Sequence, residues 1–146
     1  MSQSISVLFL CTGNSCRSQM AEGFCRSLHG DTIKSFSAGI EKHGLNPLAV
    51  KVMAEAGIDI SGHRSKTTSD LDNSEFDYVV TVCDNASETC PYFPARTRVI
   101  HRSFADPPKL AAEASTDEER LPHYRRVRDE IRDFVLALPE ILEIEK

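Results

Sequence analysis

The chain has 146 residues, of which 40% are hydrophobic and 27% are charged, and its formal net charge is -5. We expect one compact domain over residues 1–146, because a chain of this length leaves no room for a second domain and buries enough surface to fold without disulfides. The acidic balance argues against a nucleic acid or an anionic membrane as partner, whereas a local pocket can still bind a small anion.

The first residues contain a short apolar run at 5–10, which lacks the basic flank of a signal peptide and is too short to cross a bilayer. We therefore expect a cytoplasmic protein with no membrane partner. In that reducing compartment the five cysteines should be thiols unless redox chemistry is their function. An odd number also excludes a complete set of intrachain disulfides.

Strand and helix signals alternate along the chain. Asn46 followed by Pro47 predicts a helix N-terminus, residues 76–82 are rich in β-branched and aromatic side chains, and Thr116 with Glu119 resembles a capping box. The predicted strands are 4–10, 33–38, 76–82 and 97–100, and the predicted helices are 17–29, 47–56 and 115–138. Such alternation indicates parallel strands with right-handed crossovers, hence an α/β three-layer sandwich.

Chemically capable side chains follow the predicted strands. Cys11, Ser37 and Cys83 come directly at or after strand ends, and Asp106 follows the last strand by a few residues. Because ligands of parallel sheets bind beyond the carboxyl ends of the strands, we expect these side chains to converge on one rim.

Residues 11–18, CTGNSCRS, form a short polar loop between the first strand and the first helix. Successive backbone N–H groups of such a loop, backed by a helix N-terminus, bind anions. Gly13 permits a backbone geometry that a side chain would oppose, and Asn14 tolerates left-handed torsions. The residues predicted to bind the oxyanion are Thr12, Gly13, Asn14, Ser15, Cys16 and Arg17.

The side chains of this loop predict a nucleophilic thiolate. The helix dipole and Arg17 both favour the charged form of Cys11, and Ser18 can donate a hydrogen bond to it. The planar guanidinium of Arg17 can bind two oxygens of a tetrahedral anion. Cys-x5-Arg is the spacing of cysteine-dependent phosphatases; the alternative is a buried cysteine beside a structural turn.

The chain resembles the low-molecular-weight protein tyrosine phosphatase family, and more closely the thioredoxin-coupled arsenate reductases built on that fold. The resemblance runs over nearly the whole length and is carried by residues 11–22 (CTGNSCRSQMAE), 37–47 (SAGIEKHGLNP), 57–61 (GIDIS), 81–91 and 106–107. It implies a four-stranded parallel sheet in the order 2-1-3-4. It also implies Cys11 as nucleophile, Arg17 as oxyanion clamp and Asp106 as general acid.

Asp106 has support of its own, because displacing an oxygen leaving group needs a proton donor opposite the nucleophile. The alternative is an ordinary carboxylate on a surface loop.

Cys83 and Cys90 favour a reductase over a phosphatase, because only a reductase has to deliver two electrons. Cys11 would attack arsenate and Cys83 would then attack the Cys11 sulfur, releasing arsenite. Cys90 would next attack Cys83 and free Cys11, and the resulting disulfide would be reduced by thioredoxin or, in a variant cycle, by glutaredoxin with glutathione. The alternatives are two small core residues or, with less support, a zinc site.

Two other functions remain open at this stage. One is a low-molecular-weight tyrosine phosphatase, or a reductase with weak phosphatase activity. That reading is weakened because Asp106-Pro107-Pro108-Lys109 lacks the aromatic residues that line a phenyl slot. The other is a non-catalytic redox or arsenical sensor.

We predict no cofactor, no metal site and a monomer, with Cys16 and Cys25 as structural thiols. Some reductases of the family bind potassium at positions that match Asn14, Glu22 and Ser37 together with an aspartate. Lys66 occupies that last position here and could replace the cation, so we predict no potassium requirement. The five histidines show no spacing typical of a metal site and are assigned none: His29, His43, His63, His101 and His123.

Overall fold

A computed structural model describes residues 5–41, 43–71, 75–83 and 93–142 of the chain. The strands are β1 (Ile5–Cys11), β2 (Ile33–Gly39), β3 (Tyr78–Thr81) and β4 (Arg98–His101). The helices are α1 (Arg17–His29), α2 (Pro47–Glu55), α3 (Pro107–Leu110), α4 (Asp117–Leu136) and α5 (Leu138–Ile141), with a short 3₁₀ turn η1 (Thr68–Asp70).

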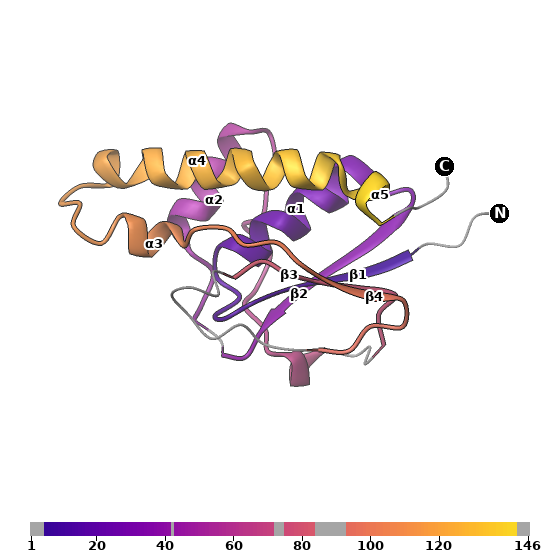
Figure 1. Cartoon of the computed structure of the whole chain (residues 1–146). Coiled ribbons are helices and arrows are strands. Elements are labelled where there is room, and N and C mark those ends of the chain that lie inside the picture. Colours follow the sequence, from indigo (N-terminus) through magenta and orange to yellow (C-terminus); the bar gives the residue numbers. More distant parts are fainter. Residues whose placement is uncertain (1–4, 42, 72–74, 84–92, 143–146) are drawn as a thin grey trace.

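The four strands form one parallel sheet in the order β2-β1-β3-β4, which confirms the predicted α/β class and strand order. The register pairs Cys11 with Gly39 on one side of β1, and Leu10 with Thr81 on the other. Helices α1, α2 and α4 lie over one face of the sheet, and η1 with its connecting segments lies below the other (Figure 1). Because β1 and β3 are parallel neighbours, the chain leaves β1 after Cys11 and β3 after Thr81 side by side at the carboxyl end of the sheet.

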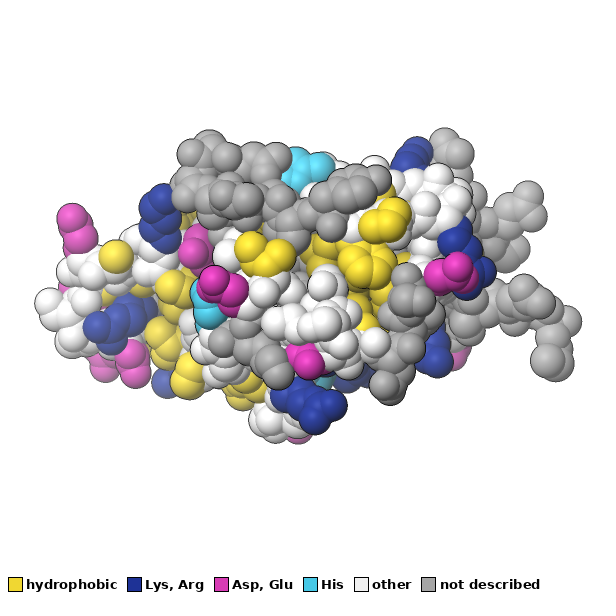
Figure 2. Space-filling model, turned by 90° about the horizontal axis from the view of Figure 1, so that it is seen from below, with side chains coloured by type: hydrophobic (Ala, Val, Ile, Leu, Met, Phe, Trp, Pro, Cys, Tyr) yellow, Lys and Arg dark blue, Asp and Glu magenta, His cyan; other side chains and the backbone are white. Residues whose placement is uncertain are grey.

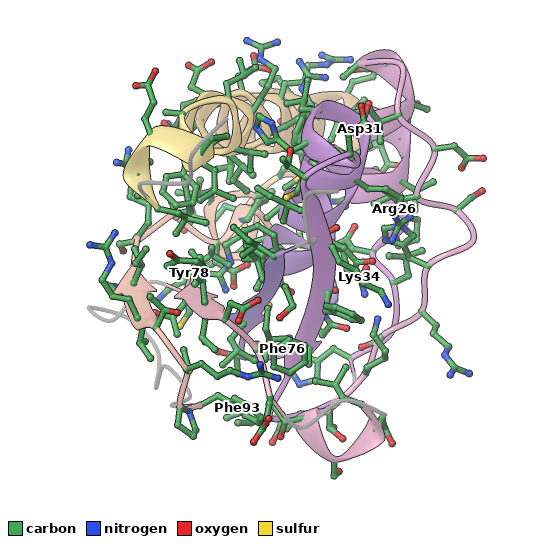
Figure 3. All side chains as sticks on the ribbon, turned by 90° about the vertical axis from the view of Figure 1, so that its right-hand side faces the viewer. Arg26, Asp31, Lys34, Phe76, Tyr78 and Phe93 are labelled. Carbon is green, nitrogen blue, oxygen red and sulfur yellow. The ribbon has the colours of Figure 1, made fainter. Side chains whose placement is uncertain are left out.

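Alternation along β1 divides the core into two parts. Val7, Phe9 and Cys11 pack with the helices, whereas Leu8 and Leu10 pack on the opposite face. The second core includes Phe76 and Phe93, whose ring centroids lie 5.8 Å apart in an edge-to-face arrangement. Figure 3 shows both rings beneath the sheet. Figure 2 shows the same face from below, where apolar side chains gather near the middle and charged side chains lie around the rim.

The boundaries of the predicted strands and helices lie within two residues of the observed ones. Strand β3 is shorter than the predicted 76–82, although Val82 still donates its backbone N–H to Leu10 O at 2.9 Å. The last predicted helix, 115–138, corresponds to α4, which ends at Leu136, and the short helix α5 that follows was not predicted. Pro139 has no N–H for the carbonyl of Val135, which instead accepts the Nε2 hydrogen of His29 at 2.7 Å.

Thr116 caps α4 as predicted, since its hydroxyl accepts the backbone N–H of Glu119 at 3.2 Å. Over the described ranges, none of the helices combines the length and the apolar character needed to cross a membrane.

Candidate active site

Cys11 is the last residue of β1, and only 3% of its surface is exposed. Val82 lies beside the end of β1 through its hydrogen bond to Leu10, so Cys83 follows β3 where the loop after Cys11 begins. Cys11 and Cys83 also belong to the same buried cluster. The rim predicted from the sequence therefore brings both cysteines to the ends of adjacent strands.

Asn14 shapes the loop after Cys11. It is the one non-glycine residue with positive φ among the described residues, at φ 48°, which confirms the left-handed torsion predicted for it. Its side chain is fully buried, and its Oδ1 accepts hydrogen bonds from Lys66 N at 2.8 Å and Gln19 Nε2 at 3.0 Å. These bonds fix the turn that directs the loop backbone around the start of α1.

Ser18 connects Asn14 to the sulfur. Asn14 Nδ2 donates to Ser18 Oγ at 2.8 Å, and Ser18 Oγ lies 2.9 Å from Cys11 Sγ. Because the amide nitrogen can only donate, it uses a lone pair of the hydroxyl and leaves the hydroxyl hydrogen for the sulfur. Ser18 therefore lies where it can stabilise a Cys11 thiolate.

Arg17 and Asp106 face each other across the opening of the loop. Arg17 is 4% exposed, donates to Phe104 O at 3.1 Å, and has its guanidinium 3.6 Å from Asp106 Oδ1. Asp106 precedes the short helix α3 and its side chain is 30% exposed. The two charged groups thus lie at the boundary between the buried loop and solvent.

The loop and the Asp106 segment enclose a small pocket of about 180 Å³. Its lining residues are Cys11, Thr12, Gly13, Ser15, Cys16, Arg17, His43, Asp106 and Pro108. Cys16, the N-cap of α1, makes no side-chain capping hydrogen bond within the described part of the chain, so the start of the helix is not blocked by a side chain. A small anion with several acceptor oxygens fits such a pocket.

The predicted site residues fall into two groups, those that line the pocket and those that lie outside its lining. Asn14 and Ser18 support the loop from behind and do not line the pocket, and neither does Ser37, whose hydroxyl donates to the carboxylate of Glu22. Gly13 lines the pocket, but its φ is not left-handed, since Gly44 and Gly57 are the glycines with positive φ among the described residues. A side chain at Gly13 is nevertheless opposed, as predicted, because a Cβ there would lie 2.2 Å from His43 Nδ1.

Two further thiols of the first helix region are buried. Burial, followed by the negative charge of Asp106, raises the pKa of Cys16 well above its ordinary value. Burial raises the pKa of Cys25 to about 12, and Cys25 lies in the core as predicted. Both groups are therefore neutral thiols at physiological pH.

The sequence analysis missed a polar chain behind the loop. Gln19 donates to Asn14 Oδ1 and its own Oε1 accepts from His63 Nδ1 at 2.9 Å, while Arg26 lies 2.7 Å from His63 Nε2. Arg26 also pairs with the buried carboxylate of Glu22. A buried glutamine two residues after the arginine of the loop was the available signal, because a buried amide needs partners on both its atoms.

The residues that match the potassium-binding positions of the family make hydrogen bonds or ion pairs within the protein. Glu22 contacts Ser37 and Arg26, and the ammonium of Lys66 donates to Arg64 O at 3.0 Å. Burial, ahead of any charge, lowers the pKa of Lys66. The direct cationic partner of Glu22 is thus Arg26, which the sequence interpretation had not considered. Within the described ranges, no three His, Cys, Asp or Glu side chains form a metal-binding group.

The redox state differs among the described cysteines. Cys11, Cys16 and Cys25 are free thiols, whereas Cys83 is disulfide-bonded. Cys90, the third member of the predicted relay, lies outside the described residues.

Known proteins resemble this chain over most of its length. An arsenate reductase of Halalkalibacterium halodurans is 52% identical over 134 residues, covering 92% of this chain and 94% of the relative. An arsenate reductase of Bacillus subtilis is 50% identical over 129 residues, covering 86% and 88%. The solved structure of an arsenate reductase in its phosphate-binding state matches with a TM-score of 0.76 and 32% identity, covering 97% of this chain and 99% of that one.

The family described as low molecular weight phosphotyrosine protein phosphatase matches residues 6–146. This match extends from β1 beyond α5 and so includes every element of the pocket. The chain belongs to the low molecular weight phosphotyrosine protein phosphatase family.

Proposed function

We propose that this protein reduces arsenate to arsenite in the cytoplasm, with thioredoxin as the electron donor. The observation that carries the proposal is the position of Cys11 in an anion-sized pocket, with Arg17 and Asp106 at its opening and Cys83 at the end of the adjacent strand. The relatives at 50–52% identity are arsenate reductases, which favours the same substrate here.

The first step forms a bond between Cys11 and arsenic. The loop N–H groups and Arg17 hold the arsenate oxygens, and the Cys11 thiolate attacks arsenic. Asp106 donates a proton to the departing oxygen, which leaves as water. Ser18 supports this step because its hydroxyl lies 2.9 Å from the attacking sulfur.

The second step transfers two electrons. The thiolate of Cys83 attacks the Cys11 sulfur, a sulfur–sulfur bond forms, and the bonding pair of the sulfur–arsenic bond stays on arsenic, which leaves as arsenite. Cys90 then attacks Cys83 and releases the Cys11 thiolate. A free Cys11 together with a disulfide-bonded Cys83 is the state expected after that release.

Thioredoxin has to reach the final disulfide. Cys83 is fully buried, so its reduction by another protein requires Cys83 to become exposed. Once Cys83 is exposed, a dithiol protein can attack its disulfide and then resolve the mixed disulfide with its own second thiol.

Weak phosphatase activity is the second candidate function, because the family match and the Cys11–Arg17–Asp106 arrangement are those of a phosphate-ester pocket. Pro108 rather than an aromatic residue lines the opening next to Asp106. We therefore expect slow turnover of aryl phosphates, because a phenyl ring finds no stacking partner there.

The test is arsenate reduction by the purified protein with thioredoxin, thioredoxin reductase and NADPH, and in parallel with glutaredoxin and glutathione. We expect activity with thioredoxin and its loss in Cys11→Ser, Cys83→Ser and Cys90→Ser. Cys25→Ala is the matched control, since Cys25 is buried but outside the relay, and it should stay active. Full activity of Cys90→Ser would replace the proposed relay, and fast aryl-phosphate turnover without arsenate reduction would favour the phosphatase.

A further inference from the structure

The ring of His43 occupies the space that a side chain at residue 13 would need. A Cβ placed on Gly13 would lie 2.2 Å from His43 Nδ1 and 2.6 Å from its Cγ. Gly13 is not in the left-handed region, so its backbone conformation does not require glycine. The close approach of the imidazole is the structural reason for glycine at this position.

His43 is held in this place by several contacts. Its backbone N–H donates to Gly13 O at 3.1 Å, and its Nε2 lies 2.7 Å from the carboxylate of Glu41. Gly44 follows with φ 82°, a left-handed torsion that turns the chain away after the histidine. The ring therefore has a defined orientation, although about half of its side-chain surface is exposed.

The orientation determines which nitrogen faces the loop. Because a carboxylate accepts hydrogen bonds, Nε2 is the nitrogen that carries a hydrogen toward Glu41. Nδ1 is the nitrogen closest to Gly13, and His43 lines the same pocket as Cys11 and Arg17. In the neutral imidazole Nδ1 is then a hydrogen-bond acceptor at the wall of an anion pocket.

A hydrogen-bond acceptor in this pocket distinguishes anions that carry a hydroxyl group from anions that carry none. The loop N–H groups and Arg17 are donors, which suit the unprotonated oxygens of an anion. Arsenate and phosphate near neutral pH carry at least one hydroxyl, whereas sulfate carries none. A hydroxyl needs an acceptor, and an unpaired acceptor facing sulfate costs free energy.

We propose that His43 is a specificity-determining residue that accepts a hydrogen bond from the hydroxyl of the bound oxyanion through Nδ1. The pocket then binds hydrogen arsenate and hydrogen phosphate in preference to sulfate. This inference rests on the proposed function, because it takes the pocket as the substrate site. Phosphate is bound but not reduced, so its binding tests His43 separately from arsenate turnover.

The experiment measures the binding of inorganic phosphate and of sulfate to the reduced full-length protein by calorimetry at pH 8 and constant ionic strength. One neutral hydrogen bond corresponds to a preference of about three- to tenfold for phosphate in the wild type. His43→Ala should lose this preference by weakening phosphate binding alone, and His43→Gln, whose amide oxygen can accept, should recover part of it. Equal weakening of both anions, or no change in either, would overturn the proposal, as would a wild type that binds phosphate no better than sulfate.

Gly13→Ala provides a second, independent variant, because its methyl group has to displace the imidazole. We expect it to reduce the ratio of phosphate to sulfate affinity in the wild type and to leave that ratio unchanged in the His43→Ala background. The same reduction in both backgrounds would show that the methyl group acts through the loop and would contradict the role of His43. Absence of arsenate reduction in an otherwise phosphate-selective protein would contradict the proposed function alone.

Discussion

The hydroxyl of Ser18 lies 2.9 Å from the sulfur of Cys11 and at the same time accepts a hydrogen bond from Asn14 at 2.8 Å. The hydrogen bond from Asn14 uses a lone pair of the hydroxyl oxygen, so the hydroxyl hydrogen is available for a bond to the sulfur. A nucleophile supported in this way depends on a residue that does not line the substrate pocket.

Ser18→Ala should slow the reaction of Cys11 by about tenfold or more, because a hydrogen bond to a charged group contributes about 1.5–3 kcal/mol. The measurement is the rate of Cys11 alkylation by iodoacetamide at fixed pH, together with kcat for arsenate reduction. Ser18→Thr is the matched variant and should retain most of the rate. Alkylation of Cys11 at the wild-type rate in the Ser18→Ala variant would show that the hydroxyl does not stabilise the thiolate.

Two substitutions of Asn14 separate the effect of its left-handed backbone torsion on stability from the effect of its side-chain hydrogen bonds. Asn14→Gly keeps a residue that adopts φ 48° without strain but removes the bonds to Ser18, Gln19 and Lys66. Asn14→Ala removes the same bonds and adds a torsional cost of about 1–2 kcal/mol. We expect both variants to unfold at lower urea concentrations than the wild type, with Asn14→Ala the less stable of the two. Equal stability of the two variants would contradict a role for the left-handed torsion.

Much of this arrangement could be predicted from the sequence. The apolar run before Cys11, the Asn46-Pro47 start of α2 and the β-branched segment around β3 are local signals, and local signals determine strands and helix starts. The convergence of Cys11, Cys83 and Asp106 followed from the rule that the carboxyl ends of parallel strands meet at one edge.

The contacts between distant segments could not be predicted in this way. Gln19 with His63 and Gly13 with His43 are pairs that only the folded chain brings together, and neither pair leaves a periodic pattern. The short helix α5 was not predicted: the last predicted helix ended at residue 138, before Pro139, and a helix of four residues leaves little periodic signal.

Asp106→Asn should lower kcat for arsenate reduction by about 10²–10⁴-fold, the usual contribution of a general acid. Its effect on phosphate binding should be much smaller, because Arg17 keeps its bond to Phe104 O and the loop N–H groups are unchanged. Single-turnover kinetics and phosphate titration of the same preparation separate the two effects. A large loss of phosphate affinity with unchanged chemistry would identify Asp106 as a binding residue instead.

The activity should not require potassium. Glu22 is already paired with Arg26 and bonded to Ser37, and the amide oxygen of Asn14 accepts from Gln19 and Lys66. Oxygen atoms that are engaged in this way are poor ligands for a cation, which would have to displace the existing bonds. Initial rates in sodium and potassium buffers of equal ionic strength should agree within about twofold, and strong saturable activation by potassium would refute the interpretation.

The stability of the protein should fall below about pH 6.5 because of His63. Burial is the main cause that lowers the pKa of this imidazole from 6.5, and the positive charges of Arg26 and Lys66 act in the same direction, while Glu22 opposes them. The hydrogen bonds agree with a neutral ring, since Nδ1 donates to Gln19 Oε1 and Nε2 accepts from Arg26. A group whose pKa is lower in the folded state is protonated more readily in the unfolded chain. The free energy of unfolding is therefore highest above pH 6.5 and declines as the pH falls from there toward the lowered pKa.

Urea unfolding of the wild type and of His63→Gln between pH 5 and pH 8 measures this dependence. Glutamine can still bond to Gln19 but does not titrate, so the variant should show a flatter decline below pH 6.5 than the wild type. A decline of the same slope in both proteins would mean that other groups, and not His63, cause the loss of stability in acid.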